Sequence, residues 1–181
     1  SEKTMSDASL LDLYLYHSIL GMGSSSPSVR ASSVGILRIS FSFGQNIREL
    51  PQFVEQLLAL CEEDTFWETR SQLLLLAITV LVTNATRQII EDENCLSAMW
   101  NIFGSLFHAN AHTNIKKVGC GAVCELLSLP AENNNLYHSF LDVILSLSEP
   151  DRNKLLGLDG VSTGKVNTNS SAALDLSPCV V

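Results

Sequence analysis

The sequence is poor in positive charge, and this shortage excludes one broad class of partner. Lysine and arginine together number 11, against 19 aspartates and glutamates in 181 residues, which gives a formal net charge of -8. Binding along the phosphate backbone of a nucleic acid depends on an excess of positive charge. We therefore expect no nucleic-acid partner.

Several short patterns that mark secreted, disulfide-bonded or catalytic proteins are also missing. There is no stretch with the basic, apolar and small-residue regions of a secretory signal, and the five cysteines include no CxxC pair. An odd number of scattered cysteines is typical of reduced thiols, so we expect a cytoplasmic protein, with nuclear and cytoskeletal locations as alternatives. Neither GxSxG nor HExxH is present, which predicts a non-catalytic protein without a cofactor.

The apolar run from Leu73 to Val82 is too short to be a membrane span. Its ten residues would cover about 15 Å as a helix, roughly half of the hydrocarbon thickness of a bilayer. A charged residue, Arg70, also lies one turn upstream. We therefore expect no membrane insertion.

The same run is better explained as the central helix of an all-α protein. Thr65 and Glu68 have the spacing of a capping box, in which each side chain satisfies a free backbone N–H at a helix start. This predicts a helix from Phe66 to about Thr83. Because a helix that is apolar on every side must be covered on every side, its neighbours should enclose it.

Caps, glycines and prolines divide the rest of the chain into further segments of helical length. In the sixth segment, Gly119 and Gly121 suggest close packing against a neighbour. After Gly160 the chain is rich in Ser, Thr, Asn and Gly, which predicts a flexible tail or linker over 160–181 behind a helical domain over 5–159. The predicted helices span 6–21, 26–44, 51–63, 66–83, 93–110, 113–130, 134–148 and 151–158.

Every second predicted helix opens with a similar phrase that contains a basic residue. These residues, Arg30, Arg70, Lys117 and Arg152, are 40, 47 and 35 positions apart, around the 40 to 47 of HEAT and armadillo units. Over residues 10–158 the sequence resembles the HEAT/armadillo superfamily. The resemblance implies an α-solenoid of about four antiparallel helix pairs and a scaffold that binds other proteins.

The resemblance also suggests where a partner would bind. The second helices of the pairs would line one long surface, on which Arg38, Gln72 and Thr79 are candidate contacts for a peptide or helical segment of a protein partner. Arg30 and Arg70 have a structural explanation, because such residues commonly pair with acidic or carbonyl groups of a neighbouring repeat. The terminal helix pairs could also self-associate, since an uncapped solenoid end displays apolar surface.

A more specific alternative is a tubulin-binding adaptor. The sequence is similar in layout to TOG domains, which place a Trp in a turn within a repeat and basic residues in adjacent turns. The likeness implies a binding edge that carries Trp67, Arg30, Lys116 and Lys117. The net charge of -8 argues against it because tubulin is acidic, and Trp67 could instead pack under the preceding loop.

The last alternative belongs to a different class, a zinc-stabilised structural domain. His108, His112, Cys120 and Cys124 are the four ligand types of a tetrahedral zinc site, and the two cysteines lie one helical turn apart. The segment around the cysteines is an apolar helical run, however, and free cysteine is among the most buried residue types. We therefore expect core cysteines and no metal.

Overall fold

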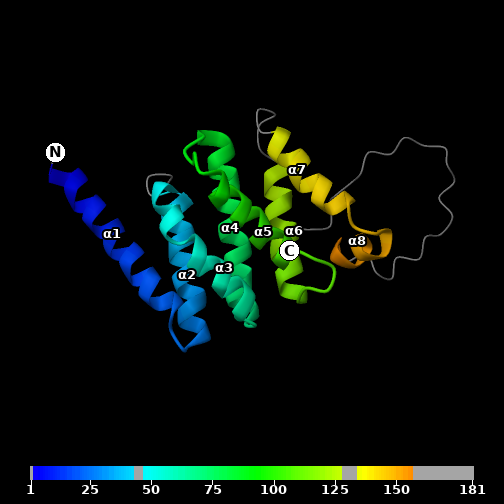
Figure 1. The fold of residues 1–181 in the computed structure, drawn as a ribbon, viewed down its shortest axis with the longest axis horizontal. Helices are drawn as coiled ribbons and strands as arrows, with labels where there is room; N and C mark the ends of the chain where they lie inside the picture. The colour runs from blue at the N-terminus through cyan, green and yellow to red at the C-terminus, as the bar shows by residue number, and fades with distance from the viewer. Residues whose placement is uncertain (1, 43–46, 128–133, 157–181) are drawn as a thin grey trace.

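The computed structural model describes residues 2–42, 47–127 and 134–156 (Figure 1). These residues form eight α-helices and one 3-10 helix and contain no strand, so the all-α prediction is confirmed. The predicted tail over 160–181 lies outside the described residues. The elements are α1 (Glu2–Met22), α2 (Pro27–Ser42), η1 (Ile47–Gln52), α3 (Val54–Glu63), α4 (Trp67–Arg87), α5 (Glu93–Leu106), α6 (Thr113–Leu127), α7 (Asn134–Leu145) and α8 (Glu149–Leu156).

The helices follow one another along the long axis of the molecule, from α1 at one end to α8 at the other (Figure 1). Helix α2 packs on α1 and on α4, and α4 packs in turn on α5 and α6. Helices α7 and α8 both contact α6, while α3 contacts α5. The second, fourth and sixth helices therefore form a continuous row with α4 in the middle.

Helix α4 is covered by its neighbours over most of its surface, though not on every side as its composition predicts. Leu73, Leu74, Leu76, Ala77 and Val80 have no exposed surface, whereas the stripe that carries Leu75 and Val82 is only partly buried. Burying one such leucine stabilises a fold by about 1.5–3 kcal/mol. The apolar run is thus the part of the chain around which the other helices assemble.

The capping-box prediction for the start of α4 is wrong. The N-cap is Phe66, which has extended backbone angles and provides no side-chain cap. The backbone N–H of Phe66 instead donates to Oδ1 of Asp64, at 2.8 Å. Asp64 occupies this place because an ion pair with Arg30 of α2 holds its carboxylate, whereas Thr65 is exposed.

Other helix boundaries also differ from the predicted ones. Pro51 does not open α3 but lies inside η1, and α3 begins at Val54. Helix α4 continues to Arg87 and ends where Gln88 adopts a left-handed conformation, with φ of 48°. Helix ends depend on local hydrogen bonds with partners far apart in sequence, which the pattern of apolar residues does not show.

The two glycines of α6 differ in their surroundings. A Cβ on Gly119 would lie 2.3 Å from the ring of Phe107, which is itself 2% exposed, so only glycine fits there. A Cβ on Gly121 would meet nothing within 4 Å. The predicted close packing is therefore correct for Gly119 and wrong for Gly121.

Helix α1 leaves a large apolar surface uncovered at one end of the molecule. Its buried residues include Leu15, Ser18 and Met22, which lie toward its C-terminal half. The predicted self-association through a terminal helix pair stays a prediction, with α1 as the candidate surface. The large apolar side chains that α1 exposes are Leu10, Leu13, Tyr14, Tyr16, Ile19 and Leu20.

Candidate binding site

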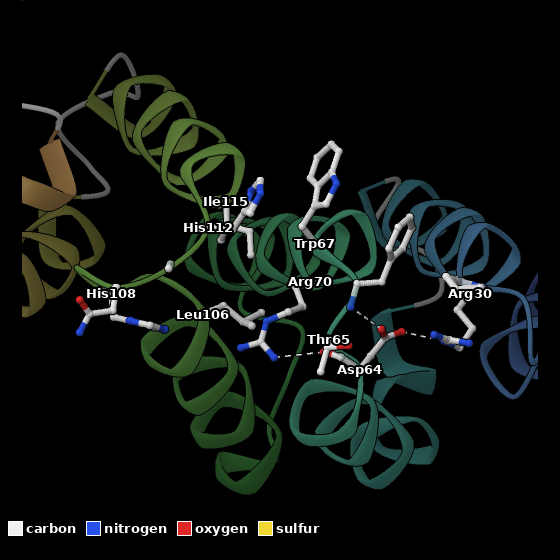
Figure 2. Close-up of a pocket in the computed structure, with 13 residues that line it drawn as sticks. Arg30, Asp64, Thr65, Trp67, Arg70, Leu106, His108, His112 and Ile115 are labelled. Atoms are coloured by element: carbon white, nitrogen blue, oxygen red, sulfur yellow. Dashed lines mark hydrogen bonds and ion pairs between the residues drawn. The ribbon is translucent and has the colours of Figure 1, made fainter.

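A pocket of about 530 Å³ opens where the N-terminal ends of α2, α4 and α6 meet (Figure 2). Its walls come from four segments that are far apart in the sequence. They are the start of α2 at Pro27 and Arg30, the stretch 64–70, the stretch 106–112 after α5, and Ile115 of α6. The size is that of a cleft for a small molecule or a short peptide segment.

One wall of the pocket is built around the carboxylate of Asp64. Nε of Arg30 donates to Oδ2 of Asp64 at 2.7 Å, and the side chain of Asp64 is only 2% exposed. Burial alone would raise the pKa of Asp64, but the hydrogen bonds from Arg30 and from the N–H of Phe66, together with the positive charge of Arg30, lower it below its ordinary value. The carboxylate is therefore ionised at neutral pH and fully engaged in holding α2 against the start of α4.

Arg70 is fixed in place without being neutralised. Its Nη1 donates to the backbone carbonyl oxygens of Asp64, at 3.1 Å, and Cys61, at 3.3 Å, at the end of α3. Within the described residues Arg70 makes no ion pair. The nearby carboxylate, that of Asp64, is paired with Arg30 instead. A guanidinium held by carbonyl groups keeps its full positive charge at the pocket wall.

The pKa of His108 is lowered by burial and by the positive charges around the pocket. Burial lowers the pKa of His108 below its ordinary value, and the nearby charges of Arg70 and Lys116 lower it further. The imidazole is thus neutral at pH 7. Lys116 is held close by hydrogen bonds from its Nζ to the carbonyl oxygens of Ala109, at 3.5 Å, and Lys154, at 3.1 Å.

An aromatic pair forms another side of the pocket. The rings of Trp67 and His112 are stacked, with centroids 5.7 Å apart and planes 12° from parallel. Nδ1 of His112 also accepts the backbone N–H of Asn114 at 3.2 Å, which fixes the imidazole at the start of α6. Figure 2 shows the two rings on one side of the pocket and Arg70 extending toward Asp64 and Thr65 on the other.

The structure brings some of the predicted site residues to this pocket. Trp67 lines it, and Lys116 lies close enough to influence His108. Lys117 is exposed on the first turn of α6 but is not part of the wall. As expected, Arg30 pairs with an acidic group beyond its own helix pair, Asp64, whereas Arg70 bonds to carbonyl groups of its own pair, those of Cys61 and Asp64, and not of a neighbouring one.

The other predicted contacts lie in the packing between helices rather than at the pocket. Arg38 and Gln72 are partly buried, and within the described residues neither Nε of Arg38 nor Oε1 of Gln72 has a hydrogen-bond partner. Gln72 lies against Gly35, so it faces α2. Thr79 donates its hydroxyl to the carbonyl of Leu75 within α4. Their contact with a partner stays a prediction.

The four residues of the zinc alternative are not brought together as a set. His112 stacks on Trp67, and Sγ of Cys120 donates to the carbonyl oxygen of Leu155, at 3.8 Å. The side chain of Cys124 lies outside the described residues. In the part of the chain that the structure describes, no three His, Cys, Asp or Glu residues are grouped so that they could hold a metal ion.

Comparisons with known proteins add no relative. No family model, curated protein or solved structure matches the chain. Among the described helices, none combines the length and the hydropathy needed to cross a bilayer.

Proposed function

We propose that this chain is a non-catalytic scaffold of HEAT/armadillo-like helix pairs that binds a protein partner. In this interpretation α1–α2, α3–α4, α5–α6 and α7–α8 are the pairs; α1 and α2 pack closely, whereas α5 packs more closely on α4 than on α6. The row of α2, α4 and α6 supports it, since stacking of second helices is the arrangement of an α-solenoid. The partner binds at the edge where these three helices begin.

The observation that carries the proposal is the composition of the pocket. It combines an aromatic side chain, Trp67, with an arginine, Arg70, that has no counter-ion among the described residues. Tryptophan and arginine are the residues most enriched among those that dominate binding energy at protein interfaces. The pocket wall is also rigid, because Asp64 and the carbonyl groups of α3 hold it, so little order has to be gained on binding.

Site-specific photocrosslinking tests this function. A photoreactive amino acid replaces the exposed Thr65 at the pocket, and a matched control carries it at the exposed Glu91, near the opposite end of α4. In cells that naturally express the protein, the first variant should give a discrete crosslinked partner that Trp67→Ala removes. Equal products from both positions, or products unaffected by Trp67→Ala, would count against the proposal.

The tubulin-binding alternative has one observation in its favour, the position of Trp67 and Arg30 in adjacent walls of the same pocket. Size-exclusion chromatography with tubulin at low salt tests it. A complex that Trp67→Ala weakens would support a TOG-like adaptor, and separate elution of the two proteins would remove it.

A further inference from the structure

We propose that the pocket recognises a carboxylate, the side chain of a glutamate or aspartate in an extended acidic segment of the partner, with Arg70 as its charged donor. This inference rests on the proposed function and specifies its ligand. It starts from the hydrogen bonds of Arg70. A guanidinium has five N–H donors, and both described bonds of Arg70 use Nη1 alone. The Nε and Nη2 donors are engaged by no hydrogen bond or ion pair within the described residues.

No carboxylate of the pocket wall competes for Arg70. Asp64 is the acidic residue among those that line the cavity, and Arg30 and the N–H of Phe66 already engage its carboxylate. The pocket is therefore locally positive on a chain whose net charge is -8. A short acidic segment would be attracted to this place and repelled by most of the remaining surface.

The shape of the pocket indicates a peptide rather than a single small anion. The cavity of about 530 Å³ is far larger than a carboxylate, and its aromatic side lies apart from Arg70 (Figure 2). A segment whose acidic side chain reaches Arg70 would place a neighbouring residue against the stacked rings of Trp67 and His112. Tryptophan offers a large and rigid apolar contact for such a residue.

The positive charge that the pocket offers to a ligand suits a carboxylate better than a phosphate. Arginine and carboxylate match as a planar pair that forms two parallel hydrogen bonds. A phosphate near neutral pH carries up to two negative charges and three acceptor oxygens, and it is typically bound by a cluster of arginines. Here Arg30 is already paired with Asp64, and burial and the nearby cations keep His108 neutral.

Binding of three degenerate seven-residue peptide pools tests the inference. The pools share random flanks and carry a central glutamate, glutamine or phosphoserine. The full chain should bind the glutamate pool at least about tenfold more tightly than the isosteric glutamine pool, and the difference should shrink with added salt. Equal binding of these two pools, binding of neither, or tighter binding of the phosphoserine pool would overturn the inference.

Substitutions test whether Arg70 is the residue that binds the glutamate. Arg70→Gln should weaken binding of the glutamate pool about tenfold, whereas Arg70→Lys should retain part of it. Arg48→Gln removes the same charge beside the other end of α4, about 25 Å from Arg70 along the helix, and should change binding less than about twofold. If Arg70→Gln does not fold, binding of the glutamate pool is measured with Trp67→Ala instead and should be weaker than in the wild-type protein. This variant leaves the bonds of Arg70 to Asp64 and Cys61 untouched. Unchanged binding by the folded variant overturns the inference.

The two proposals can fail separately. A partner crosslinked through Thr65 without any preference for glutamate over glutamine would retain the scaffold function and reject the carboxylate ligand. Glutamate-selective binding that depends on Arg70, with no crosslinked partner in cells, would retain the carboxylate site and reject the scaffold function.

Discussion

The substitution Asp64→Asn tests how the pocket wall is held together. The Asp64 carboxylate accepts hydrogen bonds from Arg30, at 2.7 Å, and from the backbone N–H of Phe66, at 2.8 Å. Asparagine keeps one acceptor oxygen and turns an NH₂ group toward the other donor, so at least one bond to a charged group is lost. Such a bond contributes about 1.5–3 kcal/mol, and we expect the free energy of unfolding to fall by this amount at neutral pH.

The pH dependence makes this prediction specific. Because the pKa of Asp64 in the folded protein lies below its ordinary value of 3.8, its carboxylate contributes stability that is fully present above pH 3.8. That contribution is lost as the pH falls through the folded pKa. The difference between the wild-type protein and Asp64→Asn should therefore shrink in strongly acidic solution.

Urea unfolding followed by far-UV circular dichroism measures both effects, at about pH 7 and about pH 3. Asp142→Asn makes the same chemical change at an exposed position of α7 and should alter stability by less than about 0.5 kcal/mol. The reasoning is refuted if the two variants are equally stable at neutral pH. It is also refuted if the deficit of Asp64→Asn is undiminished at the acidic pH.

Three further predictions concern packing, thiol reactivity and assembly. Gly119→Ala forces a methyl group against Phe107 and should destabilise the fold by about 1–3 kcal/mol, whereas Gly121→Ala should be neutral or stabilise by up to about 1 kcal/mol in urea unfolding. Burial and the hydrogen bond to a carboxylate raise the pKa of Cys95 to about 11, so mass spectrometry should find it alkylated far more slowly than a free cysteine at neutral pH. Analytical ultracentrifugation should show concentration-dependent self-association that Leu13→Glu abolishes, and an unaffected or absent association would contradict the assignment to α1.

The helices of this fold are predictable from the sequence because their signals are local. The apolar run from Leu73 to Val82 predicts a helix at the centre of the fold, and the structure buries most of it. The start of α4 is predicted to within one residue, but its cap is mispredicted, for the opposite reason. Its hydrogen bond to Asp64 depends on an ion pair with Arg30, 34 residues earlier, and no pattern within α4 shows that partner.

The pocket is predictable only in part for a similar reason. Trp67 stands out by its type and its place at the start of a helix, but the role of Arg70 depends on carbonyl groups at the end of α3. His108 and His112 fit a ligand spacing in the sequence. In the fold His108 lies in the field of Arg70 and Lys116, and His112 stacks on Trp67. These residues come together at the pocket only through the packing of four segments that are far apart in the sequence.

A nuclear magnetic resonance titration tests the central claim, that the pocket beside Trp67 and Arg70 is where a partner binds. The chain has two tryptophans, and the second, Trp100, packs against Phe103 and Phe140, so its indole N–H signal is an internal control. Adding a glutamate-centred peptide drawn from the pool should shift the signals of Trp67 and of the Arg70 side chain while that of Trp100 stays in place. The claim is contradicted if Trp67 and Arg70 do not respond, or if the glutamine-centred counterpart shifts them equally.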